Sequence, residues 1–516
     1  MTVNQKLIDE FKYTSLFSEY LPSSFNIDKT SSKDIYSVST PKSADQLHPL
    51  IFTMSNFNKN GKRRQIFIPE IVSYLVLVNH IISTNILTEI IDVSKNSKHS
   101  LSKNTNLSNG IDEFIKHDID YGVVSQNGTD QNLNYINNLS SKIKRSSGSV
   151  AILYLDISNF YKNIYTHYLS SIKIGLDNAL IEYNKKIRQQ AVSQDYNKYN
   201  NLDIYIRKQN RSETIGILTG PRLSNYIAEA FLSKIDEELY SNLIQNSKLN
   251  GIDFVRYVDD YEFFVKDIHT IDMIINIVES TMYKYRLTLN ESKTRIEDFP
   301  YYINNNLDKL KNILSKTNID YQDTMDLFDK FFLLEKQGVK GSIRYLTKSI
   351  DNVDPFDDKD LLISYLLNIL INDDRSLIKV CQKLISNKSK LILNSKHFEI
   401  IENQLIKSIN YNLDLEVIWL TYLICKIDVS KLKSDLIDLI IKSKNDLAII
   451  ILLNEATLNT QNISSVIQNA KSWLLCYELY SKNLINESDL ISTLQLNNSL
   501  DFYKNMKLNS FTFYSK

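Results

Sequence analysis

The stretch Phe254–Val265 reads FVRYVDDYEFFV and decides the expected fold. Two apolar runs rich in β-forming residues flank Asp259 and Asp260, which predicts a β-hairpin with both carboxylates at its tip. Two adjacent anions repel each other, so a cation beside them stabilises the tip. Mg²⁺ is the natural partner because it takes oxygen ligands and leaves room for substrate phosphates. An isolated Asp-Asp pair is more often a plain polar turn, so the interpretation depends on the rest of the chain.

A third carboxylate stands at the end of another expected strand. Val150–Leu155 is an unbroken apolar run, typical of a strand buried on both faces, and Asp156 follows it directly. A sheet can lay this strand beside the hairpin and bring Asp156 to Asp259 and Asp260. Carboxylates so arranged can hold two metal ions ~3.5–4 Å apart, which activate an attacking 3′ oxygen and stabilise a leaving pyrophosphate.

Composition limits the other possibilities. The 516 residues are too many for one ordinary core, so two or more domains are expected. The 60 Lys and Arg residues balance the 60 Asp and Glu residues, so any grip on nucleic acid must come from a local cluster of cations. Cys381, Cys425 and Cys476 lie too far apart for a zinc site or a disulfide framework and fit buried thiols. The polar start of the chain and the lack of a long apolar run predict a cytoplasmic protein that binds no membrane.

Two further segments carry candidate binding residues. Lys62, Arg63 and Arg64 follow an Asn-Gly turn signal and precede a strand pattern, where their charges are well placed to meet a triphosphate. A solvated basic hairpin is the alternative. Gly220 stands just before an expected helix, where the missing Cβ lets the backbone approach a flat partner such as a base pair.

Together these segments resemble the motifs of reverse transcriptases. Tyr257–Asp260 is similar to the Tyr-x-Asp-Asp hairpin of the palm, and Leu155–Tyr161 is similar to the first palm motif. Arg64–Pro69 resembles the Arg-x-Ile-x-Ile-Pro segment of the fingers. Gly216–Asn225 resembles the segment that usually contains Gln-Gly-x-x-x-Ser, and Leu287–Arg295 resembles the fourth palm motif.

The resemblance implies a role for each matched residue near the carboxylates. Asp156, Asp259 and Asp260 would bind two Mg²⁺ ions, for which Mn²⁺ could substitute, and Ile157 is included among the metal-binding residues. Lys293 would protonate the departing pyrophosphate.

The nucleotide-binding residues implied by the resemblance are Lys62, Arg63, Arg64, Tyr161, Thr219, Gly220 and Ser224. Tyr161 would occupy the gate that excludes a ribose 2′-OH, which implies deoxynucleoside triphosphates as substrates. In a chain with 31 tyrosines, composition alone would assign Tyr161 to core packing. Thr219 stands where reverse transcriptases usually have glutamine, and this departure is compatible with a weak hold on template.

The expected fold class is α+β. Residues 1–300 are predicted to form reverse-transcriptase-like fingers and a ferredoxin-like palm. In residues 301–516 apolar residues recur at helical spacing in block after block, which predicts an all-α helical-repeat domain. An extended polymerase thumb packed as a helical bundle is the alternative for this half.

A fingers and palm followed by an all-helical domain resembles the bacterial defence-associated reverse transcriptases of the abortive-infection type. The resemblance implies antiphage defence, homo-oligomers and template-independent synthesis of single-stranded DNA, with a protein tyrosine hydroxyl as a candidate primer. Two alternatives stay open. One is templated reverse transcription of a small partner RNA, and the other is a catalytically idle palm whose helical half binds a phage protein. The repelling aspartates argue against the idle palm, since a relic has no reason to keep them.

Overall fold

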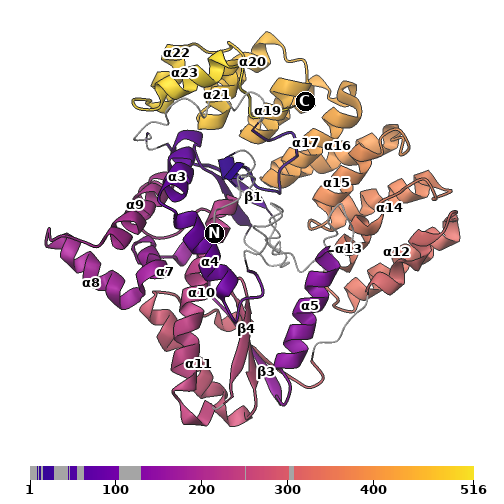
Figure 1. Cartoon of the computed structure of the whole chain (residues 1–516). Coiled ribbons are helices and arrows are strands. Elements are labelled where there is room, and N and C mark those ends of the chain that lie inside the picture. Colours follow the sequence, from indigo (N-terminus) through magenta and orange to yellow (C-terminus); the bar gives the residue numbers. More distant parts are fainter. Residues whose placement is uncertain are drawn as a thin grey trace.

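A computed structural model describes residues 8–9, 11–12, 15–27, 45, 47–54, 63–103, 130–249, 251–301 and 307–515. Lys62, one of the expected nucleotide-binding residues, lies outside the described residues. The architecture is mixed α and β: a small strand-bearing part is followed by a long succession of helices (Figure 1).

The centre of the first part is a four-stranded antiparallel sheet with the strand order β4-β5-β3-β6. Its strands are β3 (Ala151–Asp156), β4 (Asp253–Tyr257), β5 (Asp260–Val265) and β6 (Arg295–Asp298). The expected hairpin is present, because β4 pairs with β5 and Val258 and Asp259 form the turn between them. The expected apolar strand is β3, which begins one residue later than the apolar run because Val150 is half exposed.

One face of this sheet is covered by α10 (Arg222–Ile244) and α11 (Ile271–Lys284) (Figure 1). Leu153 and Leu155 of β3 point to this side and join the main hydrophobic core together with buried residues of α10. Tyr261 of β5 also lies in this core and donates its hydroxyl hydrogen to Asp236 of α10 at 2.9 Å. The middle of α10, from Tyr226 to Ser233, is buried on all sides, while towards its end the buried residues recur every three to four positions.

The opposite face of the sheet carries a separate small cluster of Ile152, Val255 and Phe264. The helix α5 (Asp130–Arg145) runs along this side of the sheet (Figure 1). Lys142 of α5 contacts the carboxylate of Glu262 on β5 at 2.5 Å. Arg145 of α5 donates to Asp253 on β4 at 2.7 Å. The C-terminal turns of α5 therefore contact the face opposite α10 and α11, where Leu101 and Tyr301 also pack against the small cluster.

A second, two-stranded antiparallel sheet lies in the segment that was predicted to form fingers, and it is called the fingers below for that prediction alone. It consists of β1 (Leu50–Met54) and β2 (Arg64–Ile68), and it leads into α3 (Ile71–Ser83) and α4 (Ile86–Asn96). Glu70 caps the N-terminus of α3 by accepting hydrogen bonds from the main-chain N–H groups of Val72 and Ser73, both at 2.8 Å. The stretch after Tyr183, which is polar in sequence, is largely helical. It lies in α8 (Leu176–Ile187) and α9 (Gln194–Gln209), joined by a short connection.

All described residues from 307 onward are helical or in short connections. The helices are α12 (Tyr321–Lys336), α13 (Ser342–Ser349), α14 (Lys359–Asn372), α15 (Leu377–Ser386), α16 (Ser395–Asn410), α17 (Asp414–Asp428), α18 (Ser434–Lys442), α19 (Asp446–Glu455), α20 (Thr460–Asn469), α21 (Trp473–Ser481), α22 (Glu487–Leu494) and α23 (Leu500–Leu508). Polar residues at the helix starts explain the repeated breaks. Asn394, Asn459 and Asn486 each form a capping box with the third residue of the following helix. The division of the chain at residue 300 stays a prediction.

The helical half folds back onto the fingers (Figure 1). Trp419 of α17 donates its indole N–H to the carbonyl of Tyr20 at 2.7 Å, and Thr53 of β1 donates its hydroxyl hydrogen to Asp414 of α17 at 2.8 Å. Near the two ends of the chain, Ser515 donates its N–H to the carbonyl of Ser24 at 2.8 Å. These contacts join segments that are hundreds of residues apart in the sequence.

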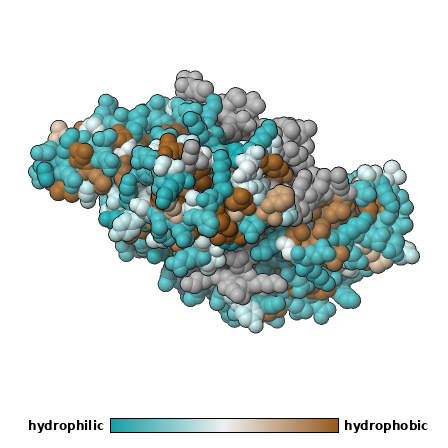
Figure 2. All heavy atoms as spheres, turned by 90° about the horizontal axis from the view of Figure 1, so that it is seen from below, coloured by the Kyte–Doolittle hydropathy of each residue, from teal (hydrophilic) through white to brown (hydrophobic). Residues whose placement is uncertain are grey.

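The surface is mostly hydrophilic with scattered apolar side chains in the view of Figure 2. The three cysteines are buried and unpaired, as expected. Within the described ranges, no single helix is long and apolar enough to cross a membrane, while the bent pair α3 and α4 passes the same length and composition test when taken together.

Candidate active site

The sheet brings the three expected metal-binding aspartates to one edge. Asp156, the last residue of β3, lies directly opposite Asp260, the first residue of β5. Asp259 is in the turn just before Asp260, and its carbonyl oxygen accepts a hydrogen bond from the N–H of Ile157 at 3.2 Å. Residues that are far apart in the sequence thus become neighbours because β3 pairs with the hairpin in this register.

Alternation along the strands decides which face carries the carboxylates. Asp156 and Asp260 have the same parity as Tyr154 and Glu262, so they stand on the sheet face that Lys142 of α5 contacts. Glu262 lies two residues from Asp260 along β5, which is about 7 Å in an extended strand. The ion pair between Lys142 of α5 and Glu262 therefore lies close to the carboxylates of Asp156 and Asp260.

A loop after α11 supplies further partners for Asp156. The Nζ of Lys293 lies 2.5 Å from Oδ2 of Asp156, and the side-chain amide of Asn290 donates to Oδ1 at 3.1 Å. The main-chain N–H of Asn290 also donates to the carbonyl of Asp156 at 2.8 Å. Lys293 lies in a short 3₁₀ turn of this loop, Glu291–Lys293.

Lys293 is held in its charged form by its surroundings. Partial burial alone would lower the pKa of the ammonium, but the hydrogen bond to Asp156 and the charges of Asp156, Asp260 and Asp259 raise it above its usual value. Its side chain is half exposed, while that of Asp156 is nearly buried. At neutral pH Lys293 therefore carries a proton within reach of the carboxylate edge.

The donor set suits a hard divalent cation. The carboxylates of Asp156, Asp259 and Asp260 offer only oxygen atoms, which are the ligands that Mg²⁺ prefers. In the geometry described, Asp156 is turned to Asn290 and Lys293, and no three or more His, Cys, Asp or Glu side chains among the described residues are already gathered closely enough to hold a metal ion. Because the Lys293 side chain is long and half exposed, it can leave Oδ2 of Asp156 without disturbing the sheet.

The residues therefore fit a divalent cation, and Asp156, Asp259 and Asp260 would hold it. Ile157 is buried beside them, and its part as a metal-binding residue stays a prediction.

Tyr161 lies near Asp259, and its part as a gate stays a prediction. Its ring is half-buried and packs edge-on against Phe160, with the ring centroids 5.5 Å apart. Its hydroxyl hydrogen is donated to the side-chain oxygen of Asn225 on α10 at 2.9 Å. Burial and then the charge of nearby Asp259 raise the pKa of the phenol, while Arg64 opposes the shift. The ring is thus fixed between the fingers and the carboxylates.

The segment before α10 is held against the fingers. The carbonyl of Thr219 accepts a hydrogen bond from the N–H of Phe67 on β2 at 2.8 Å. Gly220 has φ of +133°, and a Cβ there would come within 2.6 Å of the Phe67 carbonyl oxygen. The close approach that Gly220 permits is therefore to strand β2, whereas a base pair was expected. Ser224 lies in the first turn of α10 and is half-buried.

The basic residues of the fingers point in different directions. Arg64 is exposed on β2 near Tyr161. Arg63 instead makes a two-pronged ion pair with Glu416 of α17, so its guanidinium faces the helical half. The structure thus places Arg64 near Tyr161 and engages Arg63 with the helical half, and the binding of a nucleotide by either residue stays a prediction.

Two polar residues at the site were missed by the sequence interpretation. Asn225 holds the Tyr161 hydroxyl and Asn290 holds Asp156. Both lie inside segments that had been singled out, but an asparagine in such a segment carries no signal of its own until its partner is known.

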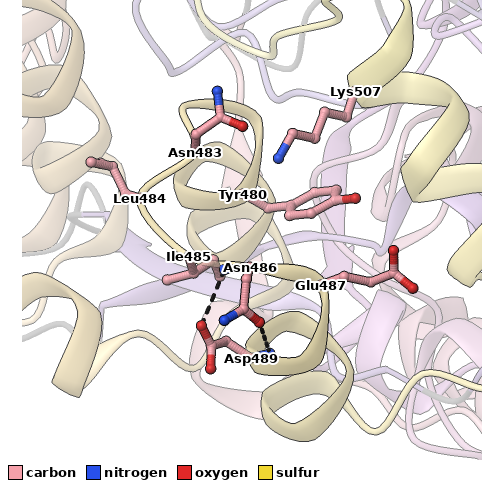
Figure 3. Close-up of a pocket in the computed structure, with 8 residues that line it drawn as sticks. All are labelled: Tyr480, Asn483, Leu484, Ile485, Asn486, Glu487, Asp489 and Lys507. Carbon is pink, nitrogen blue, oxygen red and sulfur yellow. Dashed lines mark hydrogen bonds between the residues drawn. The ribbon is translucent and has the colours of Figure 1, made fainter.

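An open hollow of about 510 Å³ lies elsewhere, in the C-terminal helices (Figure 3). Its lining includes Tyr480, Glu487 and Lys507, and the Lys507 ammonium stands 3.8 Å from the centroid of the Tyr480 ring. The lining contains none of the expected site residues, so the hollow is separate from the carboxylate edge.

The comparison with protein families identifies the domain that carries this site. Residues 99–339, a little under half of the chain, match the family described as "Reverse transcriptase (RNA-dependent DNA polymerase)". The chain therefore contains a reverse-transcriptase domain, a polymerase fold of the nucleotidyltransferase class. Such domains generally use divalent metal ions such as Mg²⁺. The matched range includes β3 to β6 and continues past residue 300 to the end of α12.

Solved structures of telomerases resemble the chain only distantly. The telomerase of Candida albicans with a fragment of telomeric RNA has 12% identity and a TM-score of 0.30, and the match covers 77% of this chain and 67% of the telomerase chain. Telomerase of Candida tropicalis with such a fragment has 12% identity and a TM-score of 0.31, and the match covers 86% of this chain and 67% of the telomerase chain. The apo form from the same species has 12% identity and a TM-score of 0.31, and the match covers 94% of this chain and 72% of the telomerase chain. No curated protein matches the sequence.

Proposed function

We propose that this chain is a DNA polymerase that joins deoxynucleotides by metal-assisted phosphoryl transfer. The observation that carries the proposal is the meeting of Asp156, Asp259 and Asp260 at one sheet edge inside a reverse-transcriptase domain. Lys293, a cation of raised pKa, lies among these carboxylates, and Tyr161 is fixed beside them. In this proposal the aspartates are the metal ligands, Lys293 is the proton donor, and the Tyr161 ring limits the space beside the sugar of a nucleotide.

Each residue has a physical part in the proposed reaction. Two Mg²⁺ ions, or Mn²⁺ in their place, would lower the barrier by activating the attacking 3′ oxygen and stabilising the pyrophosphate. Lys293 donates a proton to the leaving pyrophosphate from Nζ. The Tyr161 ring, held by Asn225, limits the space beside the sugar and thereby favours deoxynucleotides over ribonucleotides.

The decisive experiment replaces the turn carboxylates. We expect Asp259→Asn together with Asp260→Asn to reduce incorporation of labelled deoxynucleotides to background, because neutral amides hold a divalent cation poorly. Asp272→Asn is the matched control, since this aspartate is exposed and lies in the first turn of α11, outside the sheet. Full incorporation by the double variant would refute the proposal.

We further propose that the polymerase works without a template and makes single-stranded DNA. Support comes from α5, whose last turns contact the face that carries Asp156 and Asp260, with the Lys142–Glu262 ion pair one side-chain row away from the carboxylates. A duplex whose 3′ end reached these carboxylates would have to lie against the same face, and a duplex is wider than an α-helix. Thr219 in the usual glutamine position is also compatible with a weak hold on template.

Single nucleotides separate this proposal from copying of a small partner RNA. The purified protein is given one labelled deoxynucleoside triphosphate at a time with Mg²⁺ and no nucleic acid. Extension with any single base supports untemplated synthesis, and extension that appears only after RNA is added, and only with complementary bases, supports copying.

A tyrosine hydroxyl of the protein is the proposed primer. Label that migrates with the protein under denaturing conditions and is released by nuclease would support it. Tyr514 is unsuited as the primer, because its ring is buried against Phe25 and its hydroxyl hydrogen is donated to Glu455 at 2.9 Å.

The biological role proposed from the domain order is antiphage defence by a cytoplasmic homo-oligomer. Phage plating on cells that express the wild type or the Asp259→Ala, Asp260→Ala variant tests it. Protection by the wild type alone supports a catalytic role in defence. Equal protection by both would favour the idle palm with a helical scaffold that binds a phage protein. Sedimentation of the purified protein reports the oligomer.

A further inference from the structure

A fully buried arginine lies directly behind the carboxylate turn. Arg256 of β4 has no exposed surface, and its guanidinium makes ion pairs with Glu229 at 2.9 Å and with Asp236 at 2.8 Å, both on α10. The same guanidinium donates from Nη1 to the carbonyl oxygen of Val258 at 2.9 Å. A buried charge is stable only when it is paired and fully hydrogen-bonded, so this arrangement has little freedom to move.

Val258 itself has an unfavourable backbone conformation. Its φ is +54°, in the left-handed region that β-branched residues rarely adopt, and its side chain is buried. Tight hairpin turns need such positive φ values and usually place Asn, Asp or Gly there. Valine at this position must therefore be held by contacts with the surrounding structure.

Ser102 supplies the second contact to this residue. Its hydroxyl oxygen accepts the N–H of Val258 at 2.9 Å, and its hydroxyl hydrogen is donated to Glu229 at 2.9 Å. The segment before Ser102 is anchored to the edge of β4, since Leu101 donates its N–H to the carbonyl of Arg256 at 2.7 Å. The N–H and the carbonyl of Val258 are thus both bound by groups that also bind Glu229.

We propose that Arg256, Glu229 and Ser102 are positioning residues that hold Val258 in its left-handed conformation and thereby aim Asp259 and Asp260 at the metal ions. This proposal rests on the proposed function, because the carboxylates that it positions are those assigned to metal binding. The three residues touch neither nucleotide nor metal.

The arrangement also couples the turn to the nucleotide side of the site. Glu229 lies on the helix that begins just after Gly220 and carries Ser224 and Asn225 in its first turns. Any shift of α10 moves Glu229. It therefore also moves the Ser102 hydroxyl and the Arg256 guanidinium, which bind Glu229 and hold Val258. A nucleotide that contacts the start of α10 therefore acts on the metal-binding turn through one rigid helix.

The test measures binding of Mn²⁺ alone, by electron paramagnetic resonance of the full chain, beside the Mg²⁺ dependence of incorporation. Ser102→Ala removes one contact to Val258, and we expect it to weaken Mn²⁺ binding several-fold and to raise the Mg²⁺ concentration for half-maximal rate. Ser408→Ala, which removes another buried serine hydroxyl that bonds the carbonyl of Gln404, is the matched control and should change neither.

A second substitution separates positioning from general destabilisation. Glycine adopts positive φ without strain, so Val258→Gly in the Ser102→Ala background should move Mn²⁺ binding back toward the wild type, although it cannot restore the lost hydrogen bond. All titrations are made below the unfolding temperature of the weakest variant. Unchanged Mn²⁺ binding in Ser102→Ala, or no recovery in the double variant, would overturn the proposal. A wild type that binds Mn²⁺ but incorporates no nucleotide would instead refute the proposed function.

Discussion

At the scale of single residues, the reactivity of the site depends on how Lys293 and Asp156 are paired. The two charges lie 2.5 Å apart, and Asn290 holds the other oxygen of the same carboxylate. The nearly buried Asp156 carboxylate raises the pKa of Lys293, so the pair keeps a proton on Lys293. The same contact occupies an oxygen that a metal ion would use, so Lys293 both prepares the site and competes for it.

Replacing Lys293 should therefore affect rate and metal binding in opposite directions. We expect Lys293→Met to lower the incorporation rate by about 10²–10⁴-fold, the usual contribution of a general acid, while Mn²⁺ binds at least as tightly as to the wild type. Lys293→Arg keeps the charge but holds its proton too firmly to release it, so the rate should stay low. Single-turnover incorporation and Mn²⁺ titration measure the two effects. A normal rate in Lys293→Met would remove Lys293 from the mechanism.

At the scale of elements, α5 decides what can reach the carboxylate face. Two half-buried ion pairs tie the helix to the sheet: Lys142 with Glu262 and Arg145 with Asp253. Tyr301 secures the connection after the helix by donating its hydroxyl hydrogen to the carbonyl of Ser149 at 2.9 Å. Because these contacts lie on the face opposite the main core, we expect that the helix can be loosened without damage to that core.

Loosening α5 should open the site to duplexes. Each lost ion pair weakens the docking of α5 on the sheet by ~1 kcal/mol at most. We therefore expect Lys142→Ala with Arg145→Ala to extend an annealed primer on a template more than the wild type does, when each extension is compared with extension by the same protein without nucleic acid. Lys144→Ala, on the same helix but exposed, is the control for loss of a positive charge. If the double variant uses duplexes no better than the control, α5 does not restrict access.

At the scale of the whole molecule, the fingers and the helical half behave as one packed unit. Arg63 pairs with Glu416 of α17, and the cap of α3 is completed from α23, where the Tyr503 hydroxyl donates to Glu70 at 2.9 Å. Burial raises the pKa of Glu70 to about 7, although the hydrogen bonds from Ser73, Val72 and Tyr503 oppose the shift. A titratable group thus lies where the two halves of the chain meet.

Glu70 should make the stability of this junction depend on pH. Its folded pKa lies above the unfolded value of 4.5, so the folded state binds the proton more tightly and stability falls as the pH rises from about 4.5 to about 7. At ~1.4 kcal/mol per pKa unit the loss is roughly 3 kcal/mol. We expect Glu70→Gln to flatten the decrease in unfolding temperature between pH 5 and pH 7.5. Glu279→Gln, at an exposed position, should leave it unchanged. The same slope in Glu70→Gln and wild type would contradict the assignment.

Much of the fold could be predicted because its signals are local. The hairpin at Asp259, the strand that ends at Asp156 and the helix after Gly220 follow from alternation, apolar runs and helical spacing within a few residues. The successive helices after residue 307 likewise follow from their apolar period and from Asn and Asp at their starts.

Tertiary structure alone decided the partners of individual charges. The pairing of Arg63 with Glu416, the docking of α5 on the carboxylate face and the hold of Arg256 on Val258 join residues from separate elements. The sequence by itself determined which segments become strands and helices and which carboxylates end them, because those properties depend on neighbours along the chain. It could not determine which way a long charged side chain turns, because that depends on groups that become neighbours only after the chain has folded.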